Sequence, residues 1–149
     1  MSEYHDEYES ALKWAQENLS IEEIARICKK IAAKDTSGDP DGWSAERPLW
    51  AHCPRVSLIV EKLRGGSIVR QSLHRIEGFE KFNFHYSNRL PDGSYCDLSI
   101  GELRDILPEN TPKEECSRNQ MLSKPEARTI YELFEARFIA EVIKRMPSS

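Results

Sequence analysis

Cys53, His85 and Asp97 have residue types, and an order along the chain, that suit nucleophilic catalysis. A cysteine attacks as the thiolate, a histidine can take the thiol proton, and a carboxylate can hold the imidazole in position. Pro54 directly follows Cys53, and proline is favoured at the first helical position, so we expect Cys53 to be the N-cap of a helix. The free N–H groups and partial positive charge of a helix N-terminus favour a thiolate. The three residues therefore predict a thiol nucleophile, its base and the residue that orients the base.

His85 and Asp97 fall in two segments that are typical of the strands of a β-hairpin. Aromatic and polar residues alternate over residues 82–88, which places His85 on the polar face of the first strand. The intervening Pro91-Asp92-Gly93 suits a three-residue loop, which would pair Ser87 with Asp97 and put Asp97 diagonal to His85 on the same face. A two-residue turn would put the two side chains on opposite faces. The turn residues thus favour the register that a catalytic triad needs.

His52 and Asn88 are candidate auxiliary residues, because His52 could donate an N–H to an oxyanion and Asn88 is an alternative orienter of the histidine. Residues 35–50 are dense in turn formers and contain Trp43 and Trp50, and we expect this loop to line a substrate cleft. A purely structural role stays open for each candidate. Residues 35–50 could be an ordered coil anchored by Trp43 and Trp50, the histidine could be held by hydrogen bonds, and Asp97 could cap a turn.

Helices at both ends of the chain, and one that begins at the cysteine, are predicted around this hairpin. The spacing of apolar residues predicts helices over residues 4–18, 20–34, 53–64 and 125–146. Capping boxes are expected at Ser20 and Ser123, and Gly65 is expected to end the helix that Cys53 begins. Strands are expected over residues 67–72, 82–88 and 94–99. A short helix is expected over residues 100–107, followed by a loop to residue 122 with Cys116 exposed.

The length of 149 residues suits a single domain with a helical part, a part that holds the cysteine helix and the sheet, and a C-terminal helix, at residues 1–34, 50–107 and 123–146. The expected fold class is α+β. N-terminal helices and a central helix led by Cys53 would pack on an antiparallel sheet of three or more strands, and a long C-terminal helix would complete the fold. Cys28 lies in an apolar stripe and is expected in the core.

The composition argues against several classes of function. The formal net charge of −4 does not suit a protein built to bind nucleic acid. No apolar run of about 18 residues predicts a membrane span, and the acidic N-terminus lacks the features of a signal peptide, so we expect a cytoplasmic protein. The four cysteines are widely spaced and form no CxxC pair, so we expect free thiols, no metal site and no cofactor.

The region from residue 50 to about residue 103 resembles the YunG-like family of small bacterial proteins. The resemblance rests on Ala51-His52-Cys53, Gly65-Gly66-Ser67-Ile68, His85-Tyr86-Ser87-Asn88-Arg89-Leu90-Pro91-Asp92-Gly93 and Cys96-Asp97-Leu98-Ser99. The family pattern begins Gly-Gln-Cys, so His52 replaces a glutamine, and Ser87 replaces a tryptophan in the hairpin. The order Cys, His, Asp is also similar to that of the papain-like and transglutaminase-like superfamily. This similarity implies a cysteine that opens a central helix packed on an antiparallel sheet.

Together these features predict a cysteine-dependent hydrolase or acyltransferase that acts on an amide, isopeptide or thioester. Cys53 would be the nucleophile, His85 the base and Asp97 its orienter, and the substrate would be a small molecule or a peptide. The alternative is a catalytically inactive binding module on the same scaffold, which the replacements at His52 and Ser87 favour, since the loss of an oxyanion donor can cost about a hundredfold in rate. Redox sensing by Cys53 is a third possibility. The sequence predicts no particular oligomeric state.

Overall fold

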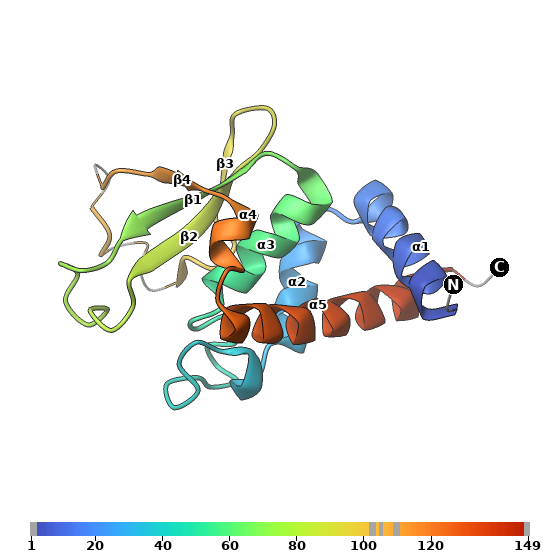
Figure 1. Cartoon of the computed structure of the whole chain (residues 1–149), viewed down its shortest axis with the longest axis horizontal. Coiled ribbons are helices and arrows are strands. Elements are labelled where there is room, and N and C mark those ends of the chain that lie inside the picture. Colours follow the sequence, from blue (N-terminus) through green and yellow to red (C-terminus); the bar gives the residue numbers. More distant parts are fainter. Residues whose placement is uncertain (1–2, 102–103, 105, 109–110, 148–149) are drawn as a thin grey trace.

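The computed structural model describes residues 3–101, 104, 106–108 and 111–147, and it has the expected α+β architecture (Figure 1). The helices are α1 (Glu3–Asn18), α2 (Ile21–Ile31), the short 3₁₀ helix η1 (Lys34–Thr36), α3 (Cys53–Arg64), α4 (Arg118–Met121) and α5 (Pro125–Arg145). The strands are β1 (Ser67–Ser72), β2 (Phe84–Arg89), β3 (Tyr95–Cys96) and β4 (Glu114–Cys116). The sheet lies at one end of the molecule and α1 at the other, with α3 between them and α5 running along the helical part.

The sheet is antiparallel, with the strand order β3-β2-β1-β4. Asn88 lies opposite Cys96, and Leu90 N–H donates to Ser94 O at 2.8 Å across the Pro91-Asp92-Gly93 loop. This is the register of the three-residue loop, so the hairpin prediction is confirmed. The strand β3 is shorter than expected, since it holds only Tyr95 and Cys96.

The strand β4 was not expected, because its segment shows no periodicity and carries charged residues. It pairs with the far edge of β1, where Ile68 lies opposite Cys116. Cys116 is therefore buried, and the expectation that it is exposed is wrong. The pairing joins segments 48 residues apart along the chain, which is why local sequence does not show it.

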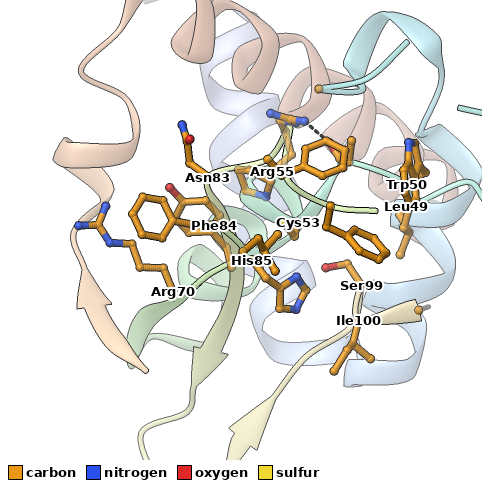
Figure 2. Close-up of a pocket in the computed structure, with 18 of the residues that line it drawn as sticks. Leu49, Trp50, Cys53, Arg55, Arg70, Asn83, Phe84, His85, Ser99 and Ile100 are labelled. Atoms are coloured by element: carbon orange, nitrogen blue, oxygen red, sulfur yellow. Dashed lines mark hydrogen bonds between the residues drawn. The ribbon is translucent and has the colours of Figure 1, made fainter. Parts of the chain in front are cut away.

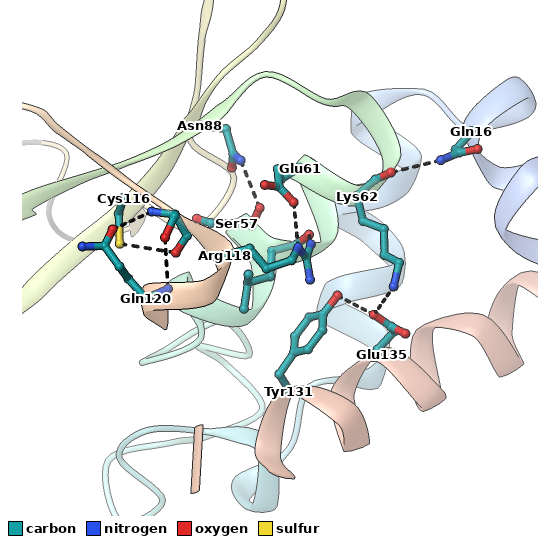
Figure 3. Close-up of polar contacts among 12 residues, drawn as sticks. Gln16, Ser57, Glu61, Lys62, Asn88, Cys116, Arg118, Gln120, Tyr131 and Glu135 are labelled. Carbon is teal, nitrogen blue, oxygen red and sulfur yellow. Dashed lines mark hydrogen bonds and ion pairs between the residues drawn. The ribbon is translucent and has the colours of Figure 1, made fainter. Parts of the chain in front are cut away.

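The helix α3 packs on β1 and β2 on one side and on α1 and α5 on the other. Its apolar residues Val56, Ile59 and Val60 are buried in one cluster with Phe134 and Phe138 of α5. Ion pairs fix the same helix from outside the core (Figure 3): Lys62 Nζ contacts Glu135 at 3.0 Å, and Arg118 contacts Glu61 at 2.8 Å. The position of the first residue of α3 is therefore set by contacts along the whole helix.

The helix ends differ from the predictions in detail. The capping box of Ser20 is confirmed, but the second helix ends at Ile31, short of residue 34. The N-cap of α5 is Lys124 without a side-chain hydrogen bond, so the capping box expected at Ser123 is wrong. A capping box is formed instead by Ser117, before α4. The short helix expected over residues 100–107 includes residues 102, 103 and 105, which lie outside the described residues. No helix in the described part of the chain is long and apolar enough to cross a membrane.

Candidate active site

Cys53 is the first residue of α3, and its N-cap is His52, so the expected cap is shifted by one residue. Pro54 occupies the first turn, and Gly65 with φ of +77° ends the helix after Arg64. The first N–H groups of a helix have no acceptor within it and are free for a ligand. Cys53 is half-buried, whereas the other three cysteines are buried. The thiol therefore combines partial access with the positive end of a helix.

His85 and Asp97 form a buried pair beside this helix end. His85 Nε2 lies 2.6 Å from Asp97 Oδ2, and the two side chains expose only 2% and 5% of their surface. The pair follows from the hairpin register, which places Asp97 just beyond β3 and diagonal to His85 on the same face of the sheet. Ser87 is buried on that face as well.

Asp97 accepts further hydrogen bonds that hold its carboxylate in place. Tyr95 donates its hydroxyl to Oδ2 at 3.2 Å, and Ser99 N–H donates to Oδ1 at 3.3 Å. Burial is the main cause that raises the pKa of Tyr95 to about 12, so its hydroxyl stays protonated and remains a donor. A carboxylate that accepts several hydrogen bonds is a rigid acceptor for an imidazole.

The environment of His85 favours its protonated form. Burial by itself would lower the pKa of His85, but hydrogen bonds with Asp97 and Cys53, and the charges of both residues, raise it to about 10. Because Nε2 faces Asp97, Nδ1 is the ring nitrogen left for Cys53. His85 and Cys53 both lie on the wall of one pocket (Figure 2), and the Nε2 side of the imidazole is bonded to Asp97.

His52 is fully buried, and both of its ring nitrogens have partners. Nδ1 lies 2.9 Å from Trp50 O, and Nε2 lies 2.7 Å from Thr36 Oγ1. The carbonyl can only accept, so Nδ1 carries the ring proton, and Nε2 is an acceptor that faces the Thr36 hydroxyl, whose oxygen also lies 3.0 Å from Ala33 O. Burial is the main cause that lowers the pKa of His52 to about 4. No ring N–H is left over for an oxyanion, so the role of His52 here is structural: its hydrogen bonds join the start of α3 to the preceding segment.

The backbone turns sharply at Ala51, which has φ of +59°. Such a left-handed conformation is unusual for a residue other than glycine. It lets Ala51 O accept from Gly38 N–H at 2.9 Å and from the Arg55 guanidinium. Glycine adopts this conformation without strain, so a residue with a side chain is unusual here.

Of the remaining candidate residues, one lines the cavity and two make structural hydrogen bonds outside it. Asn88 donates Nδ2–H to Ser57 O at 3.0 Å and so ties β2 to α3 (Figure 3), whereas His85 is bonded to Asp97. Trp50 lines the cavity, with its indole N–H donated to Asp39 at 2.8 Å. Trp43 is not among the described residues that line the cavity, and its indole N–H bonds Pro48 O at 2.9 Å.

A cavity of about 930 Å³ opens over Cys53 and His85. Trp50 forms an aromatic wall with Phe79 and Phe82, whose ring centroids lie 5.7 Å and 5.6 Å from its own. The cavity is of the size typical of small-molecule sites. Within the described part of the chain, no group of three or more histidine, cysteine, aspartate or glutamate side chains could hold a metal ion.

Arg55 also lines the cavity, and sequence reasoning did not single it out. Residues two apart on a helix do not share a face. Arg55 nevertheless reaches the cavity, because its guanidinium folds back past the start of α3 to Ala51 O. In the sequence, Arg55 stands out only because it follows Cys53 and Pro54. That position does not predict that its side chain folds back toward Ala51.

Comparison with known proteins gives one match. The sequence model of a family described as YunG protein matches residues 20–143. The matched span runs from the N-cap of α2 to near the end of α5 and includes every site candidate discussed above. No curated protein matches the chain, and no solved structure does.

Proposed function

The chain belongs to the YunG protein family, and we propose that it is a cysteine-dependent hydrolase or acyltransferase acting on an amide, isopeptide or thioester bond. The observation that carries the proposal is the buried hydrogen bond of 2.6 Å between His85 and Asp97, formed beside a half-buried Cys53 at the start of α3. A thiol, an imidazole and a carboxylate in this order are the parts that thiol-dependent acyl transfer requires.

In the proposed reaction, the proton of Cys53 already resides on His85 Nδ1, so the imidazolium holds the sulfur as a thiolate, and the thiolate attacks the carbonyl carbon of the substrate. The new S–C bond converts the carbonyl oxygen to an oxyanion. The backbone N–H groups at the start of α3 are the candidate donors to that oxyanion, because His52 has no free ring N–H. The imidazolium then gives its proton to the departing amine or thiol, which leaves a thioester on Cys53.

The second half of the reaction releases the acyl group. Water or an acceptor amine or thiol approaches the thioester, and His85 takes its proton as the new bond to the carbonyl carbon forms. The S–C bond breaks and the sulfur leaves as a thiolate beside the imidazolium, so the starting state is restored. Asp97 stabilises the imidazolium in both halves, and the raised pKa of His85, about 10, is consistent with this role.

The test is the rate at which iodoacetamide alkylates Cys53 as a function of pH, in the parent and in His85→Ala. Thiolate is the reactive form, and an imidazolium beside the sulfur favours it at low pH. We expect alkylation at pH 6 to slow at least about tenfold in His85→Ala. The exposed His74 supplies the matched control, since His74→Ala should leave the rate unchanged. Cys53→Ser identifies the labelling that belongs to other thiols.

The proposed catalytic triad is refuted if the alkylation rate of Cys53 follows the pH curve of a simple thiol and is the same in His85→Ala. That result favours the second candidate function, a catalytically inactive binding module on the same scaffold. One observation supports the module: His52 replaces the glutamine of the family pattern and has both ring nitrogens engaged. An active enzyme would then depend on backbone donors alone.

A further inference from the structure

The charged residues that line the cavity over Cys53 are mostly positive. Of its described lining residues, seven are lysine or arginine and one, Glu46, is acidic. The chain as a whole has a formal net charge of −4, so this lining is opposite in sign to the rest of the molecule. A concave site of one sign concentrates ligands of the other sign.

Some of these positive charges are already compensated within the protein. Arg70 pairs with Glu114, and Lys81 lies 2.6 Å from Asp39. Arg55 differs from both: it exposes only 7% of its surface, and no carboxylate among the described residues contacts it. It donates to Ala51 O, while its Nε–H is buried and has no acceptor in the described structure. A buried guanidinium without an anion is costly to the fold, and an anion supplied by a ligand would offset that cost.

Arg55 follows the candidate nucleophile by two residues in the first turn of α3. Arg55 and Cys53 line the same cavity (Figure 2), and the guanidinium folds back toward the start of α3, where Cys53 lies. A single guanidinium carries one charge in a planar fork that matches a carboxylate. Trp50 and Phe82 line the same cavity and offer an apolar surface.

We propose that the site selects an acyl substrate that carries a carboxylate near the bond attacked by Cys53, and that Arg55 binds this carboxylate while the aromatic wall takes an apolar part of the substrate. The proposal rests on the function proposed above. It assigns Arg55 as a specificity residue and narrows the substrates to anionic acyl compounds.

The test compares two alkylating reagents that differ in charge, iodoacetate and iodoacetamide. In both reactions the thiolate forms an S–C bond and expels iodide, so the ratio of the two rates reports the preference of the site for a carboxylate. N-acetylcysteine amide, a neutral thiol, supplies the reference ratio. We expect the iodoacetate-to-iodoacetamide ratio for Cys53 to exceed the reference about tenfold at low ionic strength, and to fall as salt screens the guanidinium.

Variants assign the preference to one side chain. In Arg55→Gln the ratio should return to the reference, and in Arg55→Lys it should stay above it. Arg26 is exposed and does not line the cavity, so Arg26→Gln is the charge-matched control and should keep the parent ratio. A parent ratio equal to the reference, or an equal ratio in the parent and Arg55→Gln, would overturn the proposal.

A measurement on the parent alone covers the case in which Arg55→Gln does not fold. Phenylpropanoate and phenylpropanamide have the same apolar group and differ in charge. Phenylpropanoate should protect Cys53 from iodoacetamide and phenylpropanamide should protect it far less, whereas equal protection by both contradicts the proposal. Both readouts use alkylation and not turnover. If the alkylation rate of Cys53 does not depend on His85, the proposed enzymatic function is refuted. If the alkylation rate shows no preference for the negatively charged reagent, only the proposed recognition of a carboxylate by Arg55 is refuted.

Discussion

The replacement Asp97→Asn is the sharpest test of how the protein holds His85. It keeps the size of the side chain and an oxygen acceptor but removes the charge that lies 2.6 Å from His85 Nε2. Two unit charges about 4 Å apart attract by about 4 kcal/mol at the effective dielectric constant of about 20 found in proteins. Since a pKa change of 1 corresponds to about 1.4 kcal/mol, the replacement should lower the pKa of His85 by roughly 3.

The assay is an NMR titration of the histidine ring protons, in which the His85 signal is identified by its loss in His85→Gln. The parent should titrate near pH 10, since hydrogen bonds and charges from Asp97 and Cys53 outweigh burial. Asp92→Asn is the matched control, because Asp92 lies in the loop of the same hairpin and bonds Ser94, not His85. It should leave the titration of His85 unchanged.

Stability should change with pH in a direction fixed by the same shift. The pKa of His85 in the folded protein, about 10, is higher than its ordinary value of 6.5. The stabilisation by protonated His85 is therefore fully present below pH 6.5 and is lost as the pH rises toward 10. Urea denaturation at pH 6 and pH 9 should show a smaller loss in Asp97→Asn than in the parent. A His85 signal that titrates near pH 6.5 in the parent, or equally in both proteins, would refute this reasoning.

Two further predictions concern the residues just before α3. Ala51→Val should destabilise the fold by about 1–2 kcal/mol in urea denaturation, because a β-branched residue resists the left-handed conformation at φ of +59°, whereas Ala51→Gly should match the parent within about 1 kcal/mol. Burial lowers the pKa of His52 from 6.5 to about 4, so the contribution of neutral His52 is present above pH 6.5 and is lost as the pH falls to 4. Over that pH interval, the free energy of unfolding should fall by about 3 kcal/mol more in the parent than in His52→Gln. Equal losses in the two proteins would contradict the assignment of His52 as a buried, neutral histidine.

The parts of the site that could be predicted from the sequence are those set by local residue chemistry. Pro54 and Gly65 bracket α3, so its bounds follow from the sequence to within one residue. The Pro91-Asp92-Gly93 loop sets the hairpin register, and that register brings His85 and Asp97 onto one face. Both inferences need only turn and capping preferences, which act over a few residues.

The parts that could not be predicted depend on long-range pairing or on an unusual backbone conformation. The pairing of β4 with β1 uses three residues without periodicity. The left-handed turn at Ala51 directs His52 inward to Thr36 and lets Arg55 reach back to the Ala51 carbonyl. Neither course follows from propensity, because alanine rarely adopts that conformation.

The choice between an enzyme and an inactive module turns on which polar residues the fold itself requires. His52 and Asn88 have complete structural explanations, since their hydrogen bonds join α3 to the loop before it and to β2. The His85–Asp97 pair and Arg55 are different, because burying ionised groups costs stability that apolar residues of similar size would not. These costly groups lie around one half-buried thiol and, apart from Asp97, line one cavity. Stability given up at one place in a fold is the trade-off expected of a functional site, which is why we favour the enzyme.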